Sequence, residues 1–144
     1  MIELDNETSL NVDENFINSI VSVFTDKEIE LIVITNDEMR VINKEHRNID
    51  SPTDVLSFPY ENMPMAPLGS IIISKDYVEV KSLELGHTNN DEFALLFIHG
   101  LLHLLGFDHE VDNGEMRDEE KRLIEKFNLP KSLIVRTDDI LEKY

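Results

Sequence analysis

Three histidines in the second half of the chain carry side chains that can bind a metal ion. His99, His103 and His109 lie in the segment FIHGLLHLLGFDH, which begins at residue 97. His99 and His103 are four residues apart in a strongly helical segment, so both imidazoles leave the same helix face. Gly106 follows where the helix needs a residue of positive φ to end, and a turn there can bring His109 back toward the other two. Three neutral imidazoles with an open fourth position suit one catalytic zinc ion (Zn2+) per chain, because structural zinc sites normally have four protein ligands.

The same spacing argues against a common class of zinc enzyme. Zinc peptidases of the H-E-x-x-H type place a glutamate directly after the first histidine, where it acts as general base. The longer motif H-E-x-x-H-x-x-G-x-x-H matches this chain in its histidines and glycine, but Gly100 stands at the glutamate position. A glycine inside a helix costs about 1 kcal/mol relative to alanine, so we expect close packing of backbone or substrate there. Peptide hydrolysis by the usual route is not expected.

Other polar residues near these motifs have more than one interpretation. Asp108 can orient a ligand imidazole through a hydrogen bond or cap the turn, and the sequence leaves both roles open. His46, next to Arg47, either lines a site or lies at the surface. His87 follows Gly86 at an expected helix end, and we interpret it as a solvated loop residue.

Composition predicts a single domain. A chain of 144 residues is long enough to bury a core without disulfides. It has no cysteine, so metal ligands cannot be thiolates. Its first residues lack the basic start and apolar run of a signal peptide, and its longest apolar stretch, residues 93–105, is too short to span a bilayer. We therefore expect a cytoplasmic protein with no membrane association, formed by residues 1–144 with an acidic tail at 131–144.

The charge balance argues against a nucleic-acid partner on first inspection. Thirteen basic and thirty acidic residues give a formal net charge of −17. The acidic residues are not spread evenly, however, since residues 112–125 and 138–142 carry many of them, and a local strip of cations can still hold a phosphate. The candidate cations in the first two-thirds of the chain are Arg40, Lys44, Arg47, Lys75 and Lys81.

Hydrophobic periodicity predicts alternating strands and helices. Strands are expected at residues 2–4, 28–34, 55–59 and 69–74. Helices are expected at 13–24, from 35 onward, at 75–85, from 90 or 91 through the histidines, and at 113–127. The histidine helix is apolar almost all round, which is typical of a helix buried at the centre of a fold. The predicted fold class is α/β or α+β, a sheet of about four strands packed against this helix.

Two further blocks, read with the histidine motif, suggest a family. Residues 43–47 fit N-x-x-x-R, residues 53–59 read T-D-V-L-S-F-P, and residues 99–109 fit H-G-x-L-H-L-x-G-x-D-H. Together with Leu-Gly-Ser-Ile at 68–71, they make the chain resemble the YbeY family of bacterial ribosomal-RNA maturation factors over most of residues 30–127. Ser70 replaces the family's usual aspartate, and His46 stands where an aromatic residue is common. The first departure puts in doubt any role for that acidic side chain at the sheet edge or the site.

The resemblance implies a zinc-dependent, single-strand-specific endoribonuclease. The implied role is ribosomal-RNA processing, notably near the 3′ end of the small-subunit RNA, and ribosome quality control, with ribosome-associated proteins as partners. It assigns His99, His103 and His109 as metal ligands and Arg47 as a functional arginine. The planar guanidinium of Arg47 could hold the scissile phosphate, although a surface ion pair with Asp50 or Asp54 is the alternative.

Three interpretations of the site remain at this point. The first is the endoribonuclease, in which metal-activated water, Asp108 or the 2′-hydroxyl of the substrate shares the work of the missing general base. The second is a metal-dependent hydrolase of another substrate class, and the third is a non-enzymatic ribosome-assembly factor with a structural metal. In all three we expect Thr53, Asp54 and Ser57 to shape the loop and the start of the strand.

Overall fold

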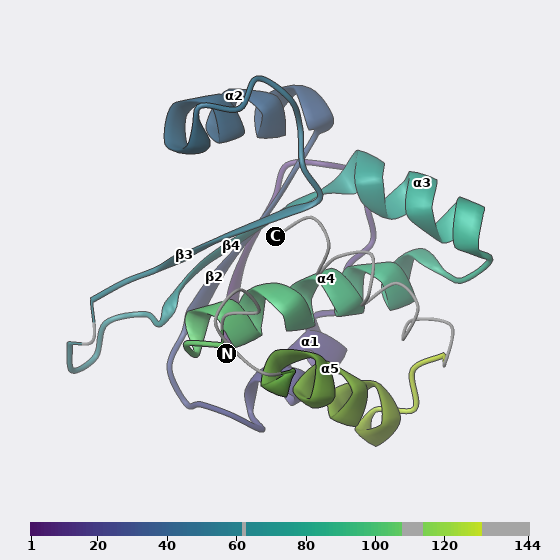
Figure 1. The fold of residues 1–144 in the computed structure, drawn as a ribbon. Coiled ribbons are helices and arrows are strands. Elements are labelled where there is room, and N and C mark those ends of the chain that lie inside the picture. The colour runs from purple at the N-terminus through teal and green to yellow at the C-terminus, as the bar shows by residue number, and fades with distance from the viewer. Residues whose placement is uncertain (62, 108–113, 131–144) are drawn as a thin grey trace.

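Helices cover both faces of a four-stranded sheet (Figure 1). The computed structural model describes residues 1–61, 63–107 and 114–130. Within these ranges the strands are β1 (Ile2–Asn6), β2 (Ile29–Ile34), β3 (Val55–Pro59) and β4 (Gly69–Ser74). The helices are α1 (Glu14–Val21), α2 (Asn36–Arg47), α3 (Lys75–Leu85), α4 (Asn89–Leu104) and α5 (Glu115–Lys126). The single-domain α+β architecture with a four-stranded sheet is confirmed.

The strands lie in the order β1-β2-β4-β3. β1, β2 and β4 are parallel, whereas β3 runs antiparallel to β4 and forms one edge of the sheet. Along β4, Ile71 and Ile73 face the main core and Ile72 faces the opposite side, as strand alternation requires. The two faces of β4 and β3 therefore belong to two different hydrophobic clusters.

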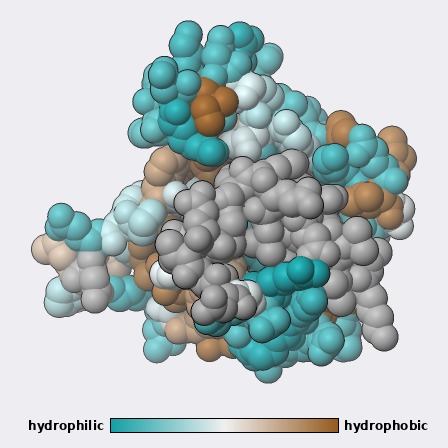
Figure 2. All heavy atoms as spheres, viewed as in Figure 1, coloured by the Kyte–Doolittle hydropathy of each residue, from teal (hydrophilic) through white to brown (hydrophobic). Residues whose placement is uncertain are grey.

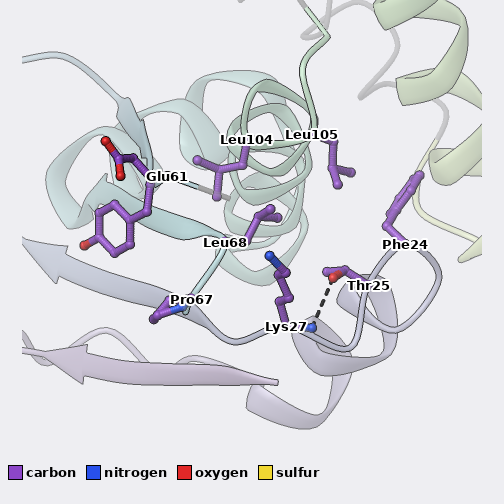
Figure 3. Close-up of a pocket in the computed structure, with 9 residues that line it drawn as sticks. Phe24, Thr25, Lys27, Glu61, Pro67, Leu68, Leu104 and Leu105 are labelled. Atoms are coloured by element: carbon purple, nitrogen blue, oxygen red, sulfur yellow. Dashed lines mark hydrogen bonds between the residues drawn. The ribbon is translucent and has the colours of Figure 1, made fainter. Parts of the chain in front are cut away.

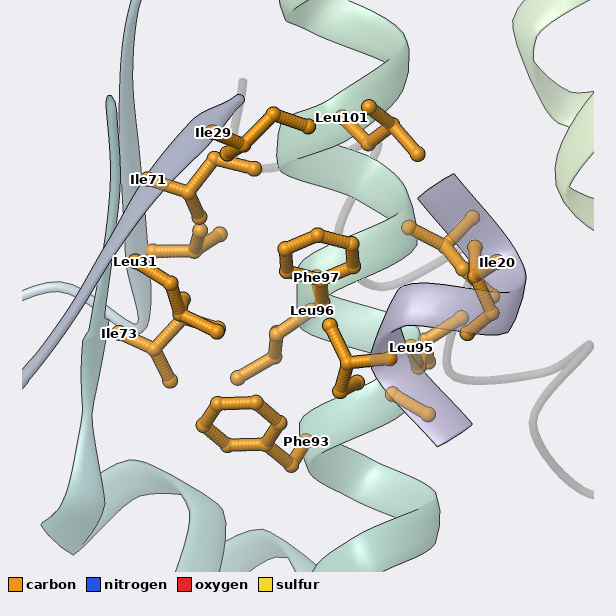
Figure 4. Packing of buried hydrophobic residues seen from close by; sticks show 14 of the residues in the cluster. Ile20, Ile29, Leu31, Ile71, Ile73, Phe93, Leu95, Leu96, Phe97 and Leu101 are labelled. Atoms are coloured by element: carbon orange, nitrogen blue, oxygen red, sulfur yellow. The ribbon is translucent and has the colours of Figure 1, made fainter. Parts of the chain in front are cut away.

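Helix α4 lies at the centre of the main core, as its composition predicts. Phe93, Phe97 and Leu101 are buried in a cluster that also includes Ile20 of α1 and Ile29 of β2 (Figure 4). The helix starts slightly earlier than residue 90, because Thr88 and Asp91 form a reciprocal capping box around its first turn. Its exit includes Gly106 at φ 98°, the positive value expected there.

Helix α2 covers the opposite face of the sheet (Figure 1). Its buried Met39 packs with Ile34, Leu56 and Ile72 in a second, smaller cluster. Hydrophilic side chains cover α2 and α5 in Figure 2, whereas apolar side chains gather over α3. No helix in the part of the chain that the structure describes is long and apolar enough to cross a membrane.

Some predicted boundaries need correction. The first helix is shorter than residues 13–24, because Asp13 is its N-cap and the chain leaves the helix after Val21. The first strand is longer than residues 2–4, because it stays paired with β2 as far as Asn6. The last helix is Glu115–Lys126 rather than residues 113–127, and Gly114 precedes it with φ 104°.

Two glycines allow α4 to approach the sheet closely. A Cβ atom at Gly100 would lie 3.0 Å from Cγ2 of Ile71 in β4. A Cβ atom at Gly69 would lie 2.5 Å from the backbone oxygen of Phe58 and 2.7 Å from Cδ2 of Leu104. Gly100 packs closely, as expected, but its contact is a strand side chain rather than the backbone or substrate that the sequence analysis expected.

Replacing Gly69 with alanine should destabilise the fold by about 1–3 kcal/mol, the usual cost of overpacking a core. The new methyl group meets a backbone oxygen, which cannot move aside without shifting β3. Gly100→Ala is the matched comparison, since its contact is a flexible isoleucine side chain and alanine favours the helix. Urea unfolding of both variants measures the difference, and equal effects would contradict this ranking.

Candidate metal centre

His99 and His103 lie on one face of α4, one turn apart. Their ring centroids are 4.9 Å apart, and the ring planes are inclined by 78°. His99 is almost completely buried, whereas His103 is half-buried. The rigid, deeply packed helix therefore holds two imidazoles close together with one of them near solvent.

Glu120 of α5 fixes the orientation of His99. Its Oε1 lies 2.8 Å from Nδ1 of His99, and both side chains are buried. A carboxylate accepts a hydrogen bond, so this contact favours the tautomer with the proton on Nδ1. The lone pair that can bind a cation is then on Nε2, and the carboxylate makes the ring a stronger ligand.

These donors fit a zinc ion in chemistry and arrangement. Neutral imidazoles are good zinc ligands, and a metal-bound histidine commonly donates its other N–H to a carboxylate. Within residues 1–61, 63–107 and 114–130, no group of three or more His, Cys, Asp or Glu side chains is placed to hold a metal ion. His109 and Asp108 lie outside the described residues, so the third predicted ligand and the proposed orienting aspartate stay predictions.

The sequence analysis did not identify Glu120. A usable signal existed, because Glu120 shares the inward face of α5 with Met116, Leu123 and Ile124, and all four are buried. A carboxylate among apolar inward positions needs a polar partner. Identifying His99 as that partner requires knowing that α5 packs against α4.

His87 is not the solvated loop residue that we expected. Its Nε2 lies 2.8 Å from Oε1 of Glu92, and its side chain is only 2% exposed. The turn after Gly86 directs the ring inward onto the first turn of α4, where the buried Glu92 provides a partner. This pair lies near the N-terminal end of α4, more than a turn of helix before His99.

Arg47 and the two histidines belong to helices that cover opposite faces of the sheet. Arg47 is the last residue of α2, whereas the histidines belong to the helix on the opposite face (Figure 1). Asp50, one of the two alternative ion-pair partners of Arg47, accepts two hydrogen bonds of 2.7 and 3.2 Å from Arg40. Asp54 is buried and accepts a hydrogen bond from the N–H of Val55, as expected for a residue that shapes the start of β3.

Carboxylates neutralise several of the candidate cations. The hydrogen bond from Arg40 lowers the pKa of Asp50 and raises that of Arg40, so both stay charged near neutral pH. Lys75 pairs with Glu79 at 3.0 Å, and Lys81 pairs with Glu84 at 3.2 Å. Three of the five candidate cations are therefore already paired with carboxylates.

The two departures from the family pattern lie on the α2 face of the sheet. His46 packs against Phe58, with ring centroids 5.0 Å apart. Ser70 is paired with Phe58 in the sheet register, on the face opposite Ile71. Neither residue is on the face that carries His99 and His103.

A pocket of about 350 Å³ lies at the C-terminal end of α4 (Figure 3). Leu68, Leu104 and Leu105 form part of its wall, and the side chain of Lys27 extends toward Leu68. Neither His99 nor His103 lines this pocket, so it is separate from the paired imidazoles.

Replacing Glu120 with glutamine should lower zinc affinity about 10- to 100-fold, because outer-shell carboxylates raise the basicity of the ligand histidine. Glutamine keeps the size of the side chain but loses its charge. Glu119→Gln is the matched control, since Glu119 pairs with Arg122 at the surface and does not contact His99. Competition with a chromogenic chelator measures the affinity, and equal affinities for the two variants would exclude an orienting role for Glu120.

Comparison with known proteins identifies the family of this chain. A family model described as Endoribonuclease YbeY matches residues 3–128. The chain is 67% identical to Endoribonuclease YbeY of Sulfurimonas denitrificans over 96% of this chain and 99% of that protein. It is 59% identical to the protein of the same name from Aliarcobacter butzleri, over 94% and 99% of the two chains. A Thermotoga maritima protein whose structure was determined in solution superposes with a TM-score of 0.61 at 27% identity, covering 88% and 89% of the two chains. The chain belongs to the YbeY endoribonuclease family.

Proposed function

We propose that this protein is a zinc-dependent endoribonuclease that cuts single-stranded RNA. Its substrate is ribosomal RNA, and its role is processing near the 3′ end of the small-subunit RNA and ribosome quality control. It acts in the cytoplasm, with ribosome-associated proteins as partners. Family membership over most of the chain supports the reaction class.

The observation that carries the proposal is the pair of imidazoles on α4 with Glu120 behind one of them. In the proposal His99, His103 and His109 hold one zinc ion per chain. A zinc ion bound there would act as a Lewis acid that activates water at neutral pH and offsets charge on a phosphate. Glu120 keeps the proton of His99 on Nδ1, and the packed core around α4 keeps that ring from rotating.

Packing at Gly100 separates this site from a zinc peptidase. A Cβ atom at position 100 would point at Ile71 of β4, so any side chain at this position would contact the sheet. The general base of H-E-x-x-H enzymes is therefore replaced here by a packing contact. In place of that glutamate, a zinc ion held by the histidines would lower the pKa of a bound water, Asp108 would accept a proton, or the 2′-hydroxyl of the RNA would act as the nucleophile.

Arg47 binds the RNA backbone in this proposal. Because it is carried by α2 and the histidines by α4, an RNA strand that contacts both must pass over the edge strand β3. The guanidinium offers two parallel donors to a phosphate, which positions the strand and offsets negative charge.

Replacing His103 with alanine should abolish both zinc binding and RNA cleavage, since only two of the three proposed ligands remain. Elemental analysis of the purified parent should find about one zinc per chain, and chelation should lower its melting temperature because the metal binds only the folded state. His46→Ala, a histidine on the α2 face, should keep the full metal content. Full metal content in the folded His103 variant would contradict the ligand assignment.

Replacing Arg47 with lysine should slow cleavage of single-stranded RNA about 10- to 1,000-fold at unchanged metal content, because lysine lacks the bidentate fork. Arg40→Lys, in the same helix, is the control and should cleave like the parent, since Arg40 is paired with Asp50. Single-turnover assays on RNA, run beside peptide and ester substrates, measure both variants. Cleavage of a peptide or ester but not RNA by the parent would favour another hydrolase class, and no cleavage by the zinc-loaded parent would favour an assembly factor.

A further inference from the structure

The register of β3 and β4 determines which backbone groups of the edge strand point away from the sheet. The N–H of Ser74 donates to the oxygen of Asp54 at 2.9 Å, and the N–H of Tyr60 donates to the oxygen of Leu68 at 3.1 Å. Hydrogen-bonded pairs alternate along an antiparallel ladder, so residues 54, 56, 58 and 60 direct their backbone groups toward β4. The outward positions are Val55, Ser57 and Pro59.

Two of these outward positions offer no free backbone donor. The N–H of Val55 donates to Oδ1 of Asp54 at 3.0 Å, and Pro59 has no N–H. Ser57 is left as the residue of β3 whose N–H points outward, and neither this N–H nor its hydroxyl makes a hydrogen bond within the described part of the chain. The edge of β3 therefore presents one backbone donor and one hydroxyl at a single residue.

The side chain of Ser57 faces the layer that contains the histidine helix. Ser57 is paired with Ile71, and directly paired residues share a face of the sheet. Ile71 is also the residue that a Cβ atom at Gly100 would contact. Gly100 lies between His99 and His103 in sequence, so Ser57 is level with the paired imidazoles.

The histidines lie on the flank of α4 that is turned toward β3. Gly100 and Leu104 face the sheet, and Leu101 points toward Ile20 of α1, the helix that contacts β1 at the other edge of the sheet (Figure 4). At 100° per residue, His99 and His103 are each about 160° around the helix from Leu101. They consequently face the side of the open edge strand, which α4 contacts directly.

We propose that Ser57 is a positioning residue that binds a phosphodiester group of the RNA at the open edge of β3. Its N–H and its hydroxyl donate to non-bridging phosphate oxygens and hold the strand beside His99 and His103. Neutral donors hold an anion without a buried counter-charge, which suits a chain with a net charge of −17. This inference rests on the proposed function and replaces the expectation that Ser57 only shapes the start of the strand.

Three substitutions at Ser57 separate its two donors. Ser57→Ala removes the hydroxyl, and Ser57→Pro also removes the N–H without breaking a ladder bond, because edge positions tolerate proline. A hydrogen bond to a charged group corresponds to about a 10-fold or larger effect, so we expect kcat/KM for a single-stranded oligoribonucleotide to fall about 10-fold and about 100-fold respectively. Ser57→Thr should recover most of the activity that Ser57→Ala loses.

Ser70→Ala is the matched control, a serine of the neighbouring strand that faces α2, and it should cleave like the parent. Zinc content and melting temperature should be unchanged in Ser57→Ala, whereas a merely structural serine would alter the melting temperature together with activity. An oligoribonucleotide with a methylphosphonate at the contacted linkage should bind the parent and Ser57→Ala equally, as measured by fluorescence anisotropy.

The outcomes distinguish this inference from the proposed function. If the parent cleaves RNA and Ser57→Ala and Ser57→Pro cleave at the parent rate, Ser57 has no positioning role and the nuclease assignment stands. Loss of activity accompanied by loss of zinc or of stability in Ser57→Ala would also overturn the inference. Should Ser57→Pro fail to fold, the comparison of the alanine and threonine variants still decides it. A parent protein that cleaves no RNA overturns the proposed function itself.

Discussion

The close approach of α4 to the sheet sets the position of His99 and His103. Gly100 and Gly69 remove the methyl groups that would hold the helix away from β4 and β3. Helices α1, α3 and α5 also contact α4, so it cannot shift without disturbing several contacts at once. Interiors packed at this density hold side chains in fixed rotamers, which is the condition that a preorganised metal site requires.

Glu120 connects this packing to chemistry. Burial of a carboxylate is costly unless the group is hydrogen-bonded, and here the partner is an imidazole that must itself be held in one tautomer. The contact between Glu120 of α5 and His99 of α4 therefore has two effects. It satisfies the buried carboxylate, and it leaves the lone pair of the His99 ring on Nε2.

Local features of the chain were predictable from the sequence. The bounds of β3, β4 and α3 follow from short apolar runs with glycine or proline nearby, and the same-face arrangement of His99 and His103 follows from helical periodicity alone. The strand order and the partners of His87 and Glu120 were not predictable, since they depend on which elements pack together. Pairing of buried polar groups across elements has no local signature beyond a polar residue at an apolar position.

The placement of Arg47 shows a different limit of sequence reasoning. A motif gathers residues that are close in the chain or shared by a family, but it does not state the distance between them. Here the arginine and the histidines belong to helices that cover opposite faces of the sheet, and the edge strand β3 lies between the two surfaces.

The two edges of the sheet also bear on the addition of strands from other molecules. An open edge strand is a template on which another chain can add a strand and begin aggregation. On β3, Pro59 has no N–H to donate, and the carboxylate of Asp54 accepts the N–H of Val55. On β1, at the other edge, Glu3 and Asp5 are exposed and charged. One edge can thus remain accessible to a nucleic acid while both resist the growth of an intermolecular sheet.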